Sequence, residues 1–541
     1  SNASSRQTRK FVRDFLEFQT ALGMVWPTPA SANNVRVPTL MIVCGKAGSY
    51  ESLRVRTSRG TNNAVHHRNG FFVEDDERSA IVIDYDFIDN QPGMLASAAD
   101  PYRRLYNQYA RFHMRRSLGG EKPPDWLEEG LARLVETIDF SQKHIEFARI
   151  DESLFHGYGM MAPGMLSIDI PFQGGFHHPA AGGYGSMSGL PMDLRYSGAR
   201  YLMPLDKMFS KDVRGGSGSM GWSTQCYVFV HMCLYGTQKK YQRGFIQFAS
   251  HLMSEPVTEE LFKQCFGRTY KQMAVEMRSY LQIAFYQSIL YKVPRGRKLF
   301  SELDNVAVRD ATQAEIGRIK GEVLRLGGRP VDSRNEFITP YLRGEREPAL
   351  LASLGLLESL EKREDRALKF LEAAARANAE RPRAYLELAK IRLRKTQAAM
   401  DNPAGRLDAT QAAFVMEPLM AARRQQPPMR GVYSLIGDIL LRGAAKPGGE
   451  QLKLMLEGVR FFPHNIELLH KTATLCLDNG NPEQASVLIE HGLKITQVSQ
   501  SNEEFEKLRA RLPAAIGRKA AVTPEADAPA KADKPAVETG E

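Results

Sequence analysis

Two neighbouring segments carry the residues best suited to chemistry. Arg103–Arg116 reads RRLYNQYARFHMRR, and Pro123–Glu136 reads PPDWLEEGLARLVE. A zinc site on helices needs two imidazoles at positions i and i+4, a glutamate that deprotonates the bound water, and a third ligand, often Glu, from a second helix. The second segment offers Glu128 and Glu129, whereas the first holds only His113 and therefore lacks the imidazole pair.

This pair of segments resembles the gluzincin, or clan MA, metallopeptidases. WLEEGLARLVE is similar to the tryptophan-containing EGLA segment of that family, and Glu129 falls on the third-ligand position. Counting back places Asn107, Gln108 and Arg111 on the HExxH positions. Further similarity in Ala199–Phe209 and Cys226–Gly236 extends the resemblance over about residues 9–285. The resemblance implies a thermolysin-like α+β domain.

The residues at the HExxH positions are incompatible with the family's chemistry. Arg111 keeps its proton and has no lone pair for a metal. Asn107 offers only an amide oxygen, and Gln108 cannot act as a general base. We therefore expect no catalytic residue and no zinc or other cofactor. Because Arg111 and Glu129 would share one zinc ion in the family, we expect an ion pair between them instead.

An active zinc hydrolase with a non-standard metal site is the alternative. Its ligands would be His177 and His178, with Glu128 or Glu129, or the pair at residues 66 and 67. Adjacent histidines point in different directions and seldom bind one ion. Tyr227 and His231 share a helix face and are candidates for lining the cleft, although packing in the core is the favoured role.

The elements that position these residues follow from apolar periodicity. A helix is expected over Arg9–Met24, and strands over Val37–Val43 and in the FFV and AIVI runs of Asn69–Asp86. Asp100-Pro101 supplies a helix start, after which Leu105, Tyr109 and Phe112 form one buried face. We assign residues 4–140 to an α+β subdomain with the degenerate zinc helix.

Residues 141–293 are expected to form a mainly helical subdomain. It contains a glycine-rich loop at 174–221, followed by helices in Trp222–Tyr235 and Leu261–Ile289. Residues 294–345 are interpreted as a connector with one helix, Ala311–Leu326.

Residues 346–500 are similar to tetratricopeptide repeats. Pro348 and Pro382 each precede a matching helix, and Leu354 and Gly355 stand where such repeats place large and small residues. An insertion near Asp401–Thr410 lengthens the middle unit. The predicted fold is therefore a gluzincin-like α+β domain followed by an all-α helical-repeat array.

Composition limits the function and the compartment. The net charge is +10, but the basic residues are scattered, so no nucleic acid is expected as a partner. No apolar run is long enough to span a membrane, and the five cysteines include no CxxC pair. Residues 1–3, SNA, look like a tag remnant, and residues 519–541 are expected to be disordered. The resemblance favours an exported or envelope-associated protein, which is compatible with a signal or anchor ahead of residue 4.

These observations predict a catalytically inactive, metallopeptidase-like scaffolding protein. Its partners would be proteins or peptides, bound by the repeat array and by the cleft. Clefts of this family hold extended peptide against an edge strand, for which Ala80–Ile83 is the candidate.

Overall fold

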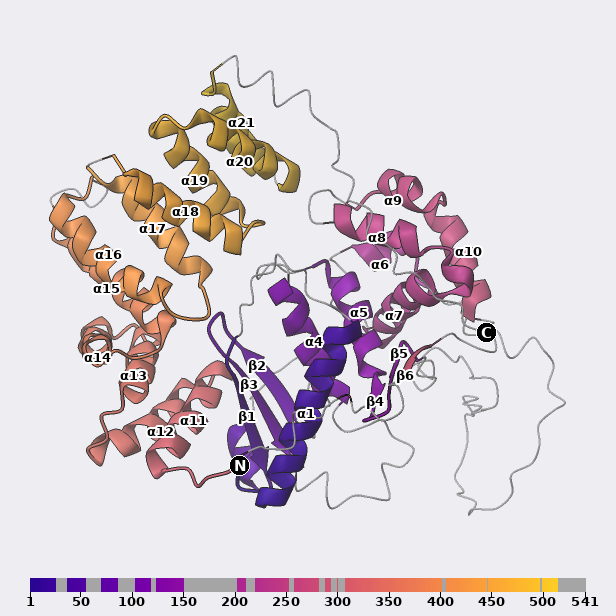
Figure 1. Ribbon diagram of the computed structural model, residues 1–541, viewed down its shortest axis with the longest axis horizontal. Coiled ribbons are helices and arrows are strands. Elements are labelled where there is room, and N and C mark those ends of the chain that lie inside the picture. Colours follow the sequence, from indigo (N-terminus) through magenta and orange to yellow (C-terminus); the bar gives the residue numbers. More distant parts are fainter. Residues whose placement is uncertain are drawn as a thin grey trace, which may run out of the picture.

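The computed structural model describes residues 1–25, 37–54, 70–85, 103–117, 123–149, 202–210, 219–252, 257–281, 288–292, 299, 307–400, 405–444, 446–496 and 499–513. The described chain is mostly helical, with two small sheets in the part before residue 293 and an all-α, repeat-like region at its C-terminal end. Figure 1 shows this region as a curved array whose inner side faces the front part of the molecule.

The front part begins with a helix and a three-stranded sheet. Its elements are α1 (Ser5–Val25), β1 (Thr39–Cys44), α2 (Ser49–Leu53), β2 (Gly70–Glu74) and β3 (Ser79–Asp84). The strand order is β1-β3-β2, with β1 parallel and β2 antiparallel to β3. The proposal of Ala80–Ile83 as an edge strand is therefore wrong, because these residues lie in the central strand and are paired on both sides. Their unbroken apolar run reflects burial on both faces of the sheet.

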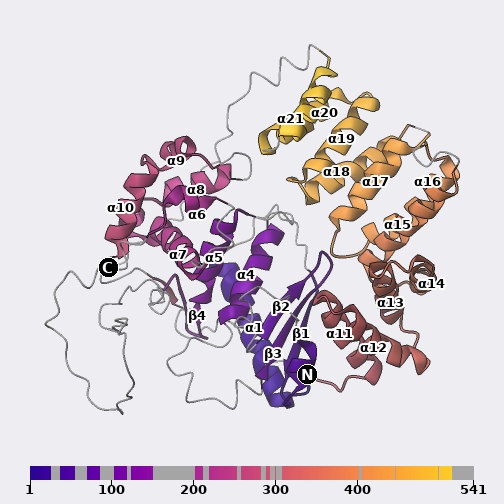
Figure 2. The same ribbon diagram turned by 180° about the vertical axis from the view of Figure 1, so that it is seen from behind.

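The two faces of this sheet pack against different parts of the chain. Val43, Ile81 and Ile83 join the core that contains the phenylalanines of α1. The alternating residues of the sheet instead contact Val323 and Leu324 of α11 (Gln313–Leu326). The first helix of the array is thus also the cover of the sheet's second face, as Figure 2 shows from behind.

The rest of the front part is helical around one aromatic core. It comprises α4 (Arg103–Ser117), α5 (Asp125–Glu136), β4 (Asp139–Phe140), β5 (His144–Phe147), α6 (Leu205–Phe209), α7 (Ser219–Tyr235), the 3-10 turn Thr237–Lys239, α8 (Gln242–His251), α9 (Glu259–Phe266), α10 (Tyr270–Leu281) and β6 (Ile289–Lys292). Strands β4, β5 and β6 form the second sheet in that order.

Two boundaries in this region differ from the sequence prediction. The helical segment expected over Leu261–Ile289 is divided at Gly267, whose φ of +64° ends α9, and Ile289 begins β6. The glycine-rich loop expected at 174–221 includes α6, whose Leu205 and Met208 are buried in the core, and the start of α7.

The array is a series of helical hairpins. Its helices are α11, α12 (Pro330–Leu342), α13 (Pro348–Leu360), α14 (Glu364–Arg376), α15 (Pro382–Ala398), α16 (Ala409–Arg423), α17 (Arg430–Arg442), α18 (Gly449–Phe461), α19 (Ile466–Asp478), α20 (Pro482–Ile495) and α21 (Ser499–Ala510). The hairpins begin at α11, ahead of the expected boundary at residue 346, because α12 forms in the predicted connector and packs on α11 and α13. Gly355 allows close packing, since a Cβ there would lie 2.7 Å from Leu371 Cγ.

Several sequence predictions are settled or fall outside the described residues. None of the five cysteines forms a disulfide bond. None of the described helices is both long and apolar enough to cross a membrane. The backbone N–H of Asn2 donates to Val43 O at 3.2 Å, so residues 1–3, interpreted as a tag remnant, contact β1. Asp100-Pro101, the histidines at 66, 67, 177 and 178, and the tail at 519–541 lie outside the described ranges.

Candidate functional site

Helices α4, α5 and α7 bring together the residues of the degenerate motif. Helix α5 packs between the other two, with Trp126 fully buried against the rings of Phe209 and Phe229 at centroid distances of 4.8 and 5.7 Å. Gly130 faces α7, where an added Cβ would lie 2.5 Å from Val230 Cγ2 and 2.7 Å from Cys226 O. The glycine that follows Glu129 is therefore needed for the close approach of α5 to α7.

The ion pair expected between Arg111 and Glu129 forms in the structure. Arg111 Nη2 donates to Glu129 Oε2, joining α4 to α5. Arg111 Nε donates to Asn107 Oδ1 at 2.9 Å, and Arg111 Nη1 lies 3.5 Å from Glu128 Oε2. The guanidinium group of Arg111 therefore contacts side-chain oxygens of Asn107, Glu128 and Glu129, and its positive charge lies between them.

Glu129 receives further donors on its second oxygen. Oε1 accepts hydrogen bonds from Arg133 Nε at 3.0 Å and from Ser223 Oγ of α7. Burial raises the pKa of Glu129, but the charges of Arg111 and Arg133 and the Ser223 hydrogen bond outweigh it and bring the pKa to about 2. Glu129 is therefore ionised at neutral pH and is a poor proton acceptor.

Further charged side chains surround the pair of Arg111 and Glu129. Glu128 is buried and accepts from Arg115 Nε, and Arg115 Nη1 also reaches Glu74 of β2 at 3.4 Å. Asn107 Nδ2 donates to Glu136 Oε1 at 2.6 Å. Three arginines (Arg111, Arg115 and Arg133) and four glutamates (Glu74, Glu128, Glu129 and Glu136) therefore form one network across α4, α5 and β2.

The sequence prediction missed some members of this network. Arg115 is four residues after Arg111 and Arg133 is four residues after Glu129, so helical spacing alone places each on the relevant face. Ser223 has no such signal, because it is 94 residues from Glu129 and arrives only through the packing of α7.

The other candidate residues lie at the edge of the site or outside it. Gln108, at the position of the general base, is exposed on α4, and its Nε2 donates to Asn107 Oδ1 at 3.5 Å. Tyr227 and His231, considered as cleft-lining residues, are fully buried in the core: Tyr227 Oη donates to Arg149 O at 3.0 Å. The His231 ring nitrogens lie 2.7 Å from Tyr280 Oη and 2.8 Å from Ala148 O, and burial lowers its pKa to about 4.

The residues present do not fit a zinc ion. Arg111 has no lone pair and lies on a carboxylate that would have to bind the metal, and Arg133 holds the other oxygen of that carboxylate. Among the described residues, no three or more His, Cys, Asp or Glu side chains are grouped so that they could hold a metal ion. The guanidinium groups satisfy buried carboxylates and join α4 to α5 and β2, and the Ser223 hydroxyl joins α7 to Glu129.

Comparison with known proteins adds no assignment. No protein-family model matches this sequence, and no curated protein matches it either.

Proposed function

We propose that this protein is a catalytically inactive, metallopeptidase-like protein that binds polypeptide partners, with its helical hairpins acting as a tetratricopeptide-like binding array. The observation that carries the proposal is the position of Arg111, which pairs with Glu129 where a gluzincin would hold zinc. An arginine in this place supplies the positive charge that the buried carboxylates need, but it supplies no ligand and no base.

The geometry of the array supports a binding role. The first helices of successive hairpins, α13, α15, α17 and α19, pack side by side along the curved array that Figure 1 shows. Arrays of this kind present extended concave surfaces to protein segments. Polar side chains of the array stay accessible, including Glu467 of α19, which is 63% exposed and accepts from Ser434 of α17.

The first experiment tests the loss of catalysis. Purified protein would be measured for bound metal and assayed for peptide cleavage with and without a chelator. We expect substoichiometric zinc and no chelator-sensitive cleavage. Stoichiometric zinc together with cleavage that the chelator abolishes would overturn the proposal and favour the zinc hydrolase, which has no support from the described residues.

The second experiment tests polypeptide binding. A peptide-display selection against the whole protein should yield ligands whose affinity falls at least tenfold in Glu467→Lys, on α19. The control is Glu450→Lys on α18, which changes another exposed glutamate, 86% exposed against 63% for Glu467, and should leave the affinity unchanged. If no peptide is selected, or if both variants behave alike, the array is not the binding surface.

A further inference from the structure

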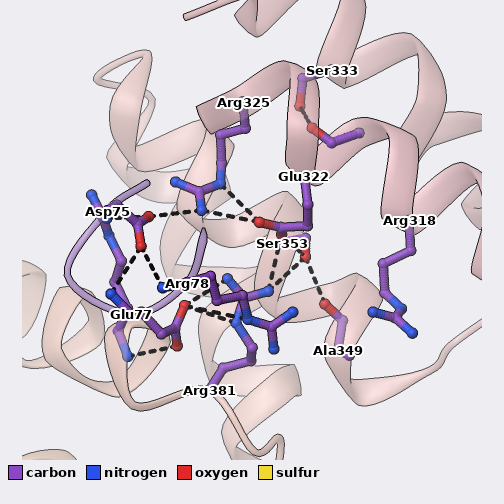
Figure 3. Close-up of polar contacts among 12 residues, drawn as sticks. Asp75, Glu77, Arg78, Arg318, Glu322, Arg325, Ser333, Ala349, Ser353 and Arg381 are labelled. Carbon is purple, nitrogen blue, oxygen red and sulfur yellow. Dashed lines mark hydrogen bonds and ion pairs between the residues drawn. The ribbon is translucent and has the colours of Figure 1, made fainter. Parts of the chain in front are cut away.

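The turn between β2 and β3 has a shape that presents two carboxylates to the array. Asp75 Oδ1 accepts from the backbone N–H groups of Glu77 and Arg78 at 2.9 and 2.8 Å, which closes the turn. Its second oxygen, Oδ2, points out of the turn together with the side chain of Glu77 (Figure 3). Asp75 therefore both shapes the turn and contributes to its outward face.

Three arginines of the array receive these carboxylates. Asp75 Oδ2 accepts from Arg325 Nη2 of α11 at 2.9 Å and from Arg383 Nη1 of α15 at 2.5 Å. Glu77 Oε2 accepts from both Nε and Nη2 of Arg381, at 3.0 and 2.7 Å, so two N–H groups converge on one oxygen. Glu77 Oε1 accepts from the backbone N–H of Arg383 at 3.1 Å. The turn is thus held by directed bonds to two helices as well as by charge.

The array positions these arginines through contacts of its own. Arg381 has no exposed surface, and its Nη1 donates to Glu322 Oε1 at 2.9 Å and to Ser353 Oγ of α13 at 3.1 Å. Glu322 is also fully buried and accepts from Arg325 Nη2 at 3.0 Å. These contacts preorganise the guanidinium groups for a carboxylate ligand.

The charges of the two surfaces match. On the array, Arg325, Arg381 and Arg383 face the single carboxylate of Glu322, so this surface by itself has an excess of positive charge. Asp75 and Glu77 bring two negative charges to this surface, and Arg78 of the same turn brings one positive charge. Arg78 Nε lies 3.8 Å from Glu77 Oε2 and makes no hydrogen bond, so the directed bonds to Glu77 come from Arg381 and from the Arg383 amide.

We propose that the inner surface of α11, α13 and α15 is a receptor for an acidic turn of the form Asp-x-Glu, and that the β2–β3 turn is its resident ligand. The resident turn closes this part of the array to acidic segments of other proteins. This inference goes beyond the proposed function, because it concerns a contact within the chain and holds whether or not the array binds other proteins.

The test begins with Glu77→Ala in the full chain, followed by hydrogen–deuterium exchange. The amide of Arg383 donates to Glu77, so its exchange should become at least tenfold faster, while the amides of β1 and β3 keep their wild-type rates. The matched control is Glu345→Ala, which removes an exposed glutamate from the loop between α12 and α13. An unchanged Arg383 amide, or equal acceleration throughout the sheet, would overturn the inference.

The second test asks whether the array binds the acidic turn when it is supplied as a separate peptide. A backbone-cyclised peptide with the sequence of residues 74–79, EDDERS, is added to the Glu77→Ala protein. We expect it to slow exchange at the Arg383 amide again, whereas the same peptide with alanine in place of Glu77 has no effect. Wild-type protein should not respond to either peptide. If the acidic peptide fails to restore slow exchange in a variant whose Arg383 amide has been released, the surface is not a receptor.

Discussion

Arg381 and Glu77 are 304 residues apart in the sequence, yet Arg381 Nη2 lies 2.7 Å from Glu77 Oε2, with both side chains buried. This contact and the packing of α11 on the sheet join the array to the front part of the molecule by two different kinds of interaction. The apolar contact fixes α11, and the ion pairs fix α15 relative to it. The front part and the first hairpins are therefore expected to unfold together.

The first prediction concerns Arg381→Leu. This change leaves the buried carboxylates of Glu77 and Glu322 without their main partner, so the free energy of unfolding should fall by about 3–5 kcal/mol. Urea denaturation followed by circular dichroism measures it. The neighbouring change Arg383→Gln, at a more exposed side chain, should cost about 1 kcal/mol or less. Equal losses of unfolding free energy in the two variants would contradict the conclusion that Arg381 is the main partner of these buried carboxylates.

The second prediction concerns the contact between α5 and α7. Gly130→Ala places a Cβ within 2.7 Å of the Cys226 carbonyl oxygen, so the helices must move apart and the protein should lose about 1–3 kcal/mol. Gly23→Ala in α1 is the matched control, because nothing lies within 4 Å of its Cβ position. That control should be neutral or stabilising by up to about 1 kcal/mol, since alanine favours helix. Thermal unfolding of both variants compares the two sites directly.

The third prediction is a loss of stability in mild acid that depends on His231. Burial lowers its pKa from 6.5 to about 4, so the unfolded chain binds a proton between these values and the folded chain does not. Stability should therefore fall as the pH decreases from 6.5 towards 4, by up to about 3 kcal/mol. His231→Gln should be less stable at pH 8 but should show a flatter slope in this interval. An unchanged slope in the variant would show that another group titrates there.

The fourth prediction places a second loss of stability at lower pH. The pKa of Glu129 falls from 4.5 to about 2, so its contribution to stability is complete above 4.5 and is lost as the pH decreases towards 2. The shift corresponds to at most about 3 kcal/mol. Glu129→Gln should be destabilised at pH 7 and should approach the wild type near pH 2. Chemical denaturation at a series of pH values separates this interval from that of His231.

The motif segments show how far sequence reasoning reaches at the site. The spacing between Arg111 and Glu129 was sufficient to predict their ion pair, because helix geometry and the resemblance together placed both residues on facing helices. Ser223 could not be found in this way, since the position of α7 against α5 depends on packing between distant segments. Whether the whole front part shares the gluzincin fold remains a proposal that rests on the resemblance.

The fold shows the same division between local and long-range information. The strands were recognisable from their apolar runs, but their order was not, and Ala80–Ile83 proved to be central. The continuous apolar pattern of β3 was the available signal, because a strand buried on both faces does not alternate. Helix α12 was missed because Pro330 and Pro340 interrupt its pattern, although the first stands at a favourable helix start. The docking of the β2–β3 turn depends on pairs more than 300 residues apart.

The last prediction asks whether the position of Arg111 is a former metal site. The triple change Asn107→His, Gln108→Glu and Arg111→His restores an imidazole pair at i and i+4 on α4 and releases Glu129 Oε2 from Arg111. We expect this variant to bind about one zinc ion per chain by elemental analysis after dialysis, with one oxygen of Glu129 as the third protein ligand. Adding Arg133→Met should tighten binding further, because Arg133 holds the other oxygen of Glu129. The same three substitutions combined with Glu129→Ala should bind at least tenfold more weakly. If zinc binds equally well without Glu129, or does not bind to the folded triple variant at all, the positional argument from the resemblance is wrong, while the Arg111–Glu129 ion pair of the wild-type protein still stands as a structural contact.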